Sequence, residues 1–185
     1  NKIINKRGIS TSYPGNNDDI LTAYTELSKN RNTELQKSNT EVNTEIPNFP
    51  ISTVQGHKGA LLFGLIGDKK VLAMQGRFHY YEGYDMKQVT FPIRVMKQLG
   101  IEKLIVSNAS GGVNPAFKVG DIMLIKDHIN MMPEHPLRGH NDERFGPRFV
   151  NMSEPYSKAM LAKLKAIATV MHIDVQEGVY LALQG

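Results

Sequence analysis

Short apolar runs separated by Gly and Pro dominate the chain from Glu45 onward, whereas residues 1–44 are mostly polar. Two of these runs, Ala60–Ile66 and Val71–Gln75, lie on either side of a Gly67-Asp68 pair, so they predict two strands joined by a turn. The remaining runs predict further strands at Leu104–Val106, Asp121–Asp127 and Val179–Leu183.

Apolar residues at helical spacing predict two helices. The first is expected over Asp85–Leu99, where Gly100 should end the helix and Pro92 should kink or split it. Ser153 is expected to cap the second helix. The apolar face of that helix would contain Leu161, Leu164, Ala168 and Met171. Alternating strands and helices favour an α/β fold with a mixed central sheet flanked by helices.

The N-terminal segment, residues 1–44, is rich in Asn, Thr, Ser, Lys and Glu. One short helix is predicted there, beginning at Asp18 or Asp19. The rest has the composition of a poorly ordered or loosely attached segment, and no strand is predicted in it. We therefore divide the chain into this polar segment and a partial α/β domain, residues 45–185.

Composition excludes several kinds of chemistry. The chain has no Cys, which excludes disulfides and thiolate catalysis, removes the commonest zinc ligand and fits a cytoplasmic protein. The histidines lack metal-site spacing and no Ser lies in a G-x-S-x-G elbow, so we expect neither a metal nor a serine nucleophile. A net charge of +4 without basic runs favours a small anionic substrate over nucleic acid. No apolar run reaches the roughly 18 to 20 residues that a membrane span needs.

The segment Gln75–Tyr84, QGRFHYYEGY, follows a predicted strand and is the first candidate for a site. Arg77 offers the planar set of donors that suits a phosphate, and His79 can donate beside it. Tyr81 adds a flat face and a hydroxyl suited to a sugar. By composition alone, the segment is equally well explained as a surface turn whose aromatic side chains pack and whose arginine is solvated.

A second candidate is the turn Ser107–Gly112, SNASGG, which follows the predicted strand Leu104–Val106. Its small residues let a ligand approach the backbone, whose N–H groups can hold an anion. Two such turns after two strands predict one site at one edge of the sheet. His57 lies in a Gly-flanked loop that can border this site.

Residues 135–156 carry Pro, Gly and charge without periodicity, which predicts a long loop. Within it, Asn141–Phe145 places carboxylates beside Arg144, and we interpret this group as a solvated charge cluster that holds the loop down, in preference to an acid/base pair. His128, at the end of a predicted strand, is expected to form a structural hydrogen bond.

From Glu45 to its end the chain resembles the purine nucleoside phosphorylases of the trimeric kind. The resemblance lies in collinear segments: EIPNFPISTVQGHKG (45–59), QGRFHYYEGY (75–84), FPIRVMKQLG (91–100), SNASGGVNP (107–115), VGDIMLIKDHIN (119–130), PLRGHNDERFG (136–146) and EGVYLALQG (177–185). It implies a nucleoside phosphorylase-like fold and the phosphorolysis of inosine or guanosine to free base and ribose 1-phosphate. No cofactor is expected, because inorganic phosphate is the co-substrate.

The resemblance also implies roles for individual residues on the phosphate. The Arg and His of the QGRFH motif correspond to Arg77 and His79, which would bind phosphate, with His79 also catalytic. The backbone N–H of Ala109 would bind the same phosphate. His57 would lie near the phosphate and the ribose.

On the nucleoside side, the resemblance implies that Tyr81 lies against the ribose. Phe149 would reach the ribose of a neighbouring subunit, which implies a homotrimer with shared sites. Asn108 and Gly111, in the turn beside Ala109, are assigned to the nucleoside as well.

Two departures from the family pattern stand out. Residues 1–44 contain no G-S-G-L-G loop, whose Ser binds phosphate in the family. The chain also ends before the P-[ST]-F-E-[TS] segment, whose Glu holds the purine. We therefore expect a truncated domain, and a non-catalytic relative that keeps a phosphate half-site is one alternative. A methylthioadenosine phosphorylase is another, although the FHYYEGY sequence argues for the nucleoside enzyme.

Overall fold

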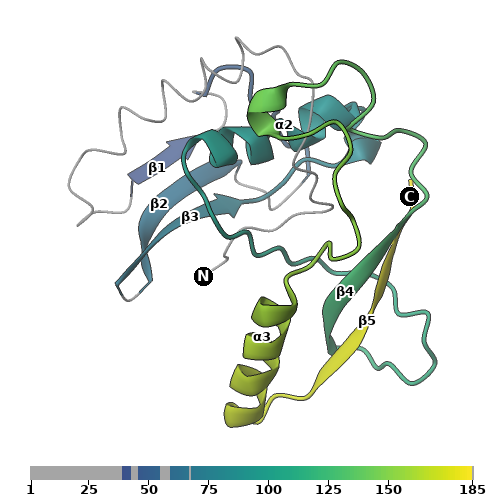
Figure 1. Ribbon diagram of the computed structural model, residues 1–185. Coiled ribbons are helices and arrows are strands. Elements are labelled where there is room, and N and C mark those ends of the chain that lie inside the picture. Colours follow the sequence, from purple (N-terminus) through teal and green to yellow (C-terminus); the bar gives the residue numbers. More distant parts are fainter. Residues whose placement is uncertain (1–38, 43–45, 55–58, 67, 185) are drawn as a thin grey trace. The chain divides into compact units, whose positions relative to one another are not determined.

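The computed structural model describes residues 39–42, 46–54, 59–66 and 68–184 (Figure 1). The chain divides into two compact units. The first comprises Asn1–Asn108 and Glu134–Arg148, and the second comprises Ala109–Pro133 and Phe149–Gly185. The helix expected from Asp18 or Asp19 lies outside the described residues.

The first unit is built on a three-stranded antiparallel sheet with the order β1-β2-β3. Strand β2 (Ala60–Ile66) pairs with β3 (Lys69–Gln75) in a register that sets Ala60 opposite Gln75. The predicted hairpin is therefore confirmed, with β3 beginning already at Lys69. Gly67 of the predicted turn lies outside the described residues.

The edge strand β1 (Asn39–Val42) was not predicted from the sequence. It pairs with β2 and sets Val42 opposite Ala60. Its sequence, NTEV, contains Asn and Glu, which are depleted in strands, so no local pattern reveals it. The strand forms because the backbone of β2 supplies a ladder of hydrogen bonds along its edge. The boundary that we placed at residue 45 stays a prediction.

Helix α2 (Met86–Gln98) has well-defined ends. At its start, the Asp85 side chain accepts a hydrogen bond from the Gln88 N–H at 2.8 Å, and the Gln88 side chain accepts one from the Asp85 N–H at 3.0 Å. At its end, Gly100 has a φ of +85°. The N–H of Ile101 then reaches the carbonyl of Met96, as in a Schellman motif. The predicted helix is thus confirmed.

Pro92 does not split α2, contrary to one of the outcomes predicted from the sequence. A proline inside a helix removes one hydrogen bond and costs about 3 kcal/mol. Here the Pro92 ring is itself buried, on the same helix as Val89, Val95 and Met96. We attribute the tolerance to this packing, which holds the turns on both sides of the proline together.

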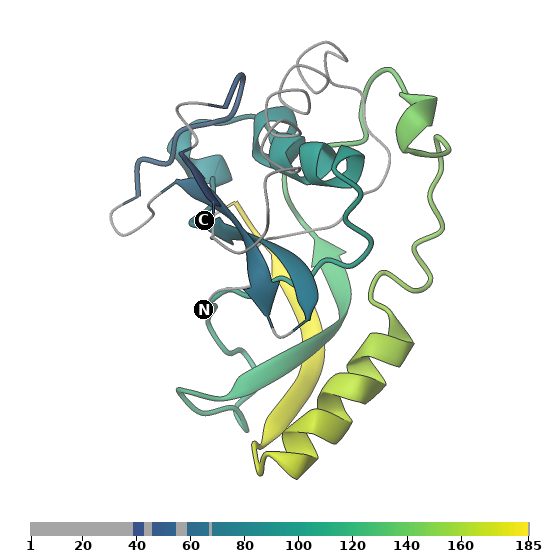
Figure 2. The same ribbon diagram turned by 90° about the vertical axis from the view of Figure 1, so that its left-hand side faces the viewer.

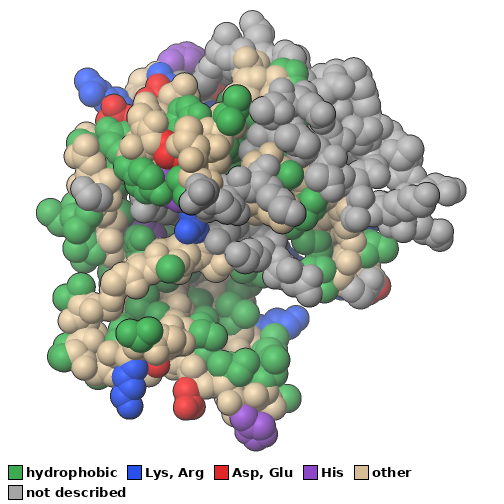
Figure 3. Space-filling model, turned by 180° about the vertical axis from the view of Figure 1, so that it is seen from behind, with side chains coloured by type: hydrophobic (Ala, Val, Ile, Leu, Met, Phe, Trp, Pro, Cys, Tyr) green, Lys and Arg blue, Asp and Glu red, His purple; other side chains and the backbone are tan. Residues whose placement is uncertain are grey.

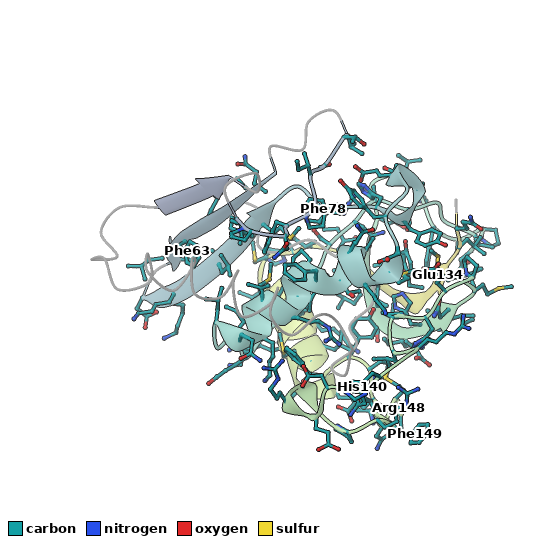
Figure 4. The ribbon with its side chains drawn as sticks, turned by 90° about the horizontal axis from the view of Figure 1, so that it is seen from above. Phe63, Phe78, Glu134, His140, Arg148 and Phe149 are labelled. Carbon is teal, nitrogen blue, oxygen red and sulfur yellow. The ribbon has the colours of Figure 1, made fainter. Side chains whose placement is uncertain are left out.

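One hydrophobic core stabilises the first unit. It combines side chains from β2, β3 and α2 with side chains from the segments that precede and follow them. Phe63 of β2 packs against this core and Phe78 lies within it (Figure 4). The buried members are Ile46, Phe49, Leu61, Leu72, Met74, Phe78, Val95, Met96, Leu99 and Phe145.

Residues Leu104–Val106 do not form a strand, so that prediction was wrong. An apolar run becomes a strand only where a neighbouring backbone pairs with it, and in the described part of the chain no segment does so here. The described strands accordingly fall into two sheets instead of one mixed central sheet, while the α/β class itself is confirmed.

The second unit contains two parallel strands and one helix (Figures 1 and 2). Strand β4 (Ile122–Asn130) pairs with β5 (Val175–Ala182), and their register shifts between Ile125 and Asp127. Helix α3 (Lys158–Val170) connects them as the crossover that parallel strands require. Both predicted strands are confirmed and are longer than predicted, although β4 begins just after Asp121 and β5 ends just before Leu183.

The N-cap of α3 is Ser157 and not Ser153 as predicted. The Ser157 side chain accepts a hydrogen bond from the N–H of Met160 at 3.3 Å. A helix that began after Ser153 would need Glu154 in the helical conformation, but Pro155 disfavours that conformation in the residue before it. The helix therefore begins after the proline.

His128 of β4 lies in a cluster of aromatic side chains in the second unit. Its Nδ1 is 2.6 Å from the Tyr156 hydroxyl, and its ring centroid is 4.9 Å from that of Tyr180. Burial lowers the pKa of His128, although the Asp127 charge opposes this. Burial also raises the pKa of Tyr156 to about 12. His128 thus has the structural hydrogen bond expected for it.

The second unit also exposes many apolar side chains, which appear green in the lower half of Figure 3. They come from both strands and from α3, and they include Ile122, Ile129, Ile167, Val170, Val179 and Leu181. Among the described helices, none is long and apolar enough to cross a membrane.

The core of the first unit yields a direct test. Leu61→Ala should lower the free energy of unfolding by about 2–5 kcal/mol, because Leu61 is 0% exposed and its loss leaves a cavity. Leu65→Ala, on the same strand but 49% exposed, should change it by less than about 1 kcal/mol. Urea unfolding followed by circular dichroism measures both. Equal losses in the two variants would contradict this assignment of the core.

Candidate functional site

The loop after β3 is anchored by Phe78, whose side chain is 2% exposed in the core. Its ring meets the ring of Tyr84 edge-on, with centroids 6.3 Å apart. Gly76, with a φ of +108°, makes the turn out of the strand. Arg77 and His79 flank the anchor, so burial of Phe78 fixes the backbone from which both side chains project.

Arg77 connects the two turns that the sequence predicts to share a site. Its Nε donates to Nε2 of His79 at 3.0 Å, and its Nη1 donates to the carbonyl of Ser107 at 3.1 Å. Ser107 opens the predicted anion-binding turn. Within the first unit, a guanidinium therefore spans from the loop after β3 to the start of that turn.

The ring of His79 is held in one protonation state by its partners. Arginine has only donors, so the contact from Arg77 requires a lone pair on Nε2 of His79. The proton of the neutral ring then sits on Nδ1, which lies 2.6 Å from Oε1 of Glu82. The arrangement therefore describes a neutral imidazole that presents a basic nitrogen next to Arg77.

Glu82 is the buried partner that holds the proton of the ring on Nδ1. Its side chain is 2% exposed. It accepts four hydrogen bonds, from the N–H and Nδ1 of His79 and from the N–H and hydroxyl of Thr53. Burial by itself would raise the pKa of Glu82, but these hydrogen bonds outweigh it and lower the pKa from 4.5 to about 2. The carboxylate is therefore charged at any neutral pH.

Tyr81 stacks on the site from the solvent side. Its ring lies 4.7 Å from that of His79 at an angle of 16° and is 58% exposed. An exposed aromatic face beside a basic nitrogen and a guanidinium suits a polar ligand that carries both an anion and a sugar. Tyr81 thus lies next to the two residues that the sequence grouped with it.

For the other predicted site residues, the structure gives the unit to which each belongs and its exposure. Asn108 follows Ser107 and is half-buried at the end of the first unit. Ala109 and Gly111 belong to the second unit, where both are exposed. Phe149, labelled in Figure 4, also belongs to the second unit and is 89% exposed. His57 lies outside the described residues, so its role and those of the other four stay predictions.

The charge cluster of residues 141–145 has a structural role, as predicted, but it is not solvated throughout, because Asp142 is buried. The Arg144 guanidinium makes paired hydrogen bonds to the buried carboxylate of Asp142, with Nη2 2.8 Å from Oδ2. The hydrogen bond to Arg144 is the main cause that lowers the pKa of Asp142. Arg94 of α2 lies over the Phe145 ring at 4.7 Å. These contacts hold the 3-10 turn Glu143–Phe145 against the core.

Sequence reasoning missed Glu82 and Thr53, although Glu82 lies inside a segment that it singled out. The available signal was the spacing, because a Glu three residues after a His in a tight turn can reach back to its ring. Thr53 precedes Glu82 by 29 residues, and no local pattern announces that contact. Among the described residues, no group of three or more His, Cys, Asp or Glu side chains could hold a metal.

Comparison with known proteins places this geometry in a family. Residues 29–185 match the family model of the Phosphorylase superfamily. Since that match spans well over half of the sequence, the chain belongs to the phosphorylase superfamily. The match begins inside the polar segment and includes β1.

Relatives and solved structures specify which members of the family the chain is similar to. It is 55% identical over 142 residues to purine nucleoside phosphorylase 1 of Geobacillus stearothermophilus, a match that covers 77% of this chain and 52% of the relative. It is 55% identical over 146 residues to purine nucleoside phosphorylase of Mus musculus, covering 76% and 50%. The chain thus spans about half the length of these curated relatives.

A solved purine nucleoside phosphorylase from Schistosoma mansoni, in a complex with BCX-34, superposes with a TM-score of 0.84. It is 35% identical, and the match covers 96% of this chain and 72% of that one. Isoform 2 from the same organism, in complex with cytosine and ribose-1-phosphate, gives a TM-score of 0.82 at 35% identity, covering 92% and 67%. The nucleoside phosphorylase-like fold expected from the sequence is therefore confirmed.

Glu82→Gln tests the buried carboxylate. We expect it to lower the free energy of unfolding by about 2 kcal/mol at neutral pH, because charge-assisted hydrogen bonds are lost in a buried site. The folded-state pKa of about 2 lies below the ordinary 4.5, so this stabilisation is present above pH 4.5 and disappears as the pH falls toward 2. The difference in the free energy of unfolding between wild type and Glu82→Gln should therefore narrow as the pH falls from 4.5 toward 2.

Urea unfolding at a series of pH values measures the gap. Glu143→Gln is the matched control, because Glu143 is an exposed glutamate of the same unit. It should change the stability by no more than about 0.5 kcal/mol. A gap for Glu82→Gln that does not vary with pH would contradict the charged state assigned to Glu82.

Proposed function

We propose that this protein carries out phosphorolysis of purine nucleosides such as inosine and guanosine, which yields the free base and ribose 1-phosphate. The observation that carries the proposal is the hydrogen-bonded chain Arg77–His79–Glu82 directly after β3. It lies in a chain that is similar along most of its length to purine nucleoside phosphorylases. Phosphorolysis needs no protein nucleophile, because phosphate itself attacks.

Phosphate would bind at Arg77 and His79. A guanidinium attracts a doubly charged oxyanion and can hold it through parallel N–H donors. The lone pair on Nε2 of His79 accepts the Arg77 Nε–H in the structure. Once a bound phosphate draws the guanidinium to its own oxygens, this lone pair can accept the hydroxyl proton of the phosphate. The backbone N–H of Ala109 and the side chain of His57 are further phosphate contacts in this proposal, supported by the family resemblance.

In the reaction, one bond to the anomeric carbon forms while another breaks. A phosphate oxygen forms a bond to the anomeric carbon while the bond from that carbon to the purine nitrogen breaks, and its electron pair leaves with the base, which takes up a proton. His79 would draw the hydroxyl proton of phosphate toward Nε2, which increases the negative charge on the attacking oxygen. Glu82 would stabilise the imidazolium that results, since its carboxylate lies at Nδ1. Positioning and electrostatics then supply most of the rate.

The nucleoside would lie on the open side of His79. Tyr81 is exposed there and stacked on the histidine, which supports its role at the ribose. Phe149, Asn108 and Gly111 complete the proposed nucleoside contacts. A Schistosoma mansoni relative was solved with ribose-1-phosphate, the sugar product expected here.

The relatives named above support the nucleoside enzyme over a methylthioadenosine phosphorylase. A homotrimer, in which Phe149 contributes to a neighbouring ribose site, and a cytoplasmic location are also part of the proposal. Exposure of most of the Phe149 side chain supports the first of these, since a contact between subunits needs an accessible ring.

Arg77→Gln should weaken phosphate binding by about 10- to 100-fold, because it removes the charge and its paired donors. Arg138→Gln, at an exposed arginine of the same unit, should leave binding unchanged. Isothermal titration calorimetry with inorganic phosphate measures the affinity for phosphate. An ultraviolet absorbance assay of inosine cleavage, with and without phosphate, measures turnover. Wild-type affinity in Arg77→Gln would remove the basis for the proposed site, and inosine cleavage that is independent of phosphate would exclude phosphorolysis.

A further inference from the structure

Thr53 binds the buried carboxylate of Glu82 through two donors. Its backbone N–H lies 2.7 Å and its hydroxyl 2.9 Å from Oε2. Both donors meet the same oxygen, although the two residues are 29 positions apart. No role in the site follows for Thr53 from the sequence, since it precedes the Gly-flanked loop of His57 without a feature of its own.

The two oxygens of Glu82 are divided between two partners. Oε2 takes both donors of Thr53, while Oε1 takes the N–H of His79 at 2.8 Å and lies 2.6 Å from its Nδ1. A carboxylate turns easily about its last single bond, which is a soft torsion. Two donors on one oxygen restrict that rotation and thereby hold the other oxygen at the imidazole.

The backbone that carries Thr53 is fixed from a second direction. The Tyr84 hydroxyl donates to the carbonyl of Ile51 at 2.5 Å and accepts from the Ile51 N–H at 3.1 Å. Tyr84 in turn packs its ring on Phe78 in the core. The position of Thr53 is therefore set by the same anchor that sets Arg77 and His79.

We infer that Thr53 is a positioning residue for His79: it fixes the Glu82 carboxylate so that Oε1 holds the imidazole proton on Nδ1 and leaves the lone pair on Nε2, next to Arg77. As a feature of a phosphate site, the inference rests on the proposed function. Thr53 touches neither substrate nor phosphate in this scheme and acts only through Glu82. Its hydroxyl adds a third donor to the backbone N–H groups of Thr53 and His79, and so further restricts the rotation of the carboxylate that would let the ring exchange its proton between the two nitrogens.

Thr53→Val tests the inference, because it keeps the shape and the backbone N–H and removes only the hydroxyl. The readout is the nitrogen NMR spectrum of the protein labelled at histidine, in which the two ring nitrogens report the position of the proton. The His79 signals are assigned by their absence in His79→Gln. We expect the preference for the Nδ1–H form over the Nε2–H form to fall by about three- to tenfold.

Thr53→Ser retains a hydroxyl and should restore the wild-type preference. Thr90→Val is the matched control, since its hydroxyl binds the carbonyl of Met86 within α2, outside this network. It should leave the His79 signals unchanged. Thr53→Ala serves as a second variant that also lacks the hydroxyl, so the inference stays testable if the valine variant does not fold. Unchanged His79 signals in a folded Thr53→Val or Thr53→Ala protein would overturn the inference.

Turnover separates this inference from the proposed function. If the variants shift the His79 proton and also raise the KM for phosphate by about three- to tenfold with wild-type folding, the positioning role holds for the reaction. If the Thr53 variants shift the His79 proton but the wild-type protein does not cleave inosine, then Thr53 still positions His79 and the proposed function is rejected. Normal cleavage in both variants, with an unshifted proton, would retain the function and reject the role of Thr53.

Discussion

A buried negative charge at Glu82 constrains everything around the candidate site. A carboxylate removed from water is tolerated only where hydrogen bonds replace its hydration. Here they come from His79 on the same turn and from Thr53 on a distant segment. Satisfying one charge therefore brings two parts of the chain together, orients an imidazole and leaves its other nitrogen facing a guanidinium.

The hydrophobic core makes this arrangement rigid. Phe78 lies between Arg77 and His79 in the sequence, and its burial prevents the loop after β3 from moving as a free turn. Tyr84 extends the same anchor to Ile51 through its hydroxyl. Packing, rather than the hydrogen bonds alone, holds the donors and acceptors at bonding distance, because each bond in partial contact with water contributes little.

The second unit is also held together by packing, but its hydrophobic core is smaller. Its two parallel strands are joined through α3, and the Lys165–Glu177 ion pair at 2.8 Å adds a link between helix and strand. Such exposed pairs contribute about 0–1 kcal/mol, so burial of Ala168 and the aromatic cluster around His128 contributes more. Phosphorylase relatives and this chain share the fold across both units.

Local patterns in the sequence determined the β2–β3 hairpin, both helices and the strands β4 and β5, because alternation, helical spacing and capping act over a few residues. They also singled out Arg77, His79 and Tyr81, which the structure brings together. Tertiary structure decided what depends on distant partners. Asn39–Val42 became a strand and Leu104–Val106 did not, since a ladder needs a neighbouring backbone. Glu82 and Thr53 come into contact for the same reason. The tertiary structure determines which donors surround a buried charge, and the spacing of residues along the chain does not predict them.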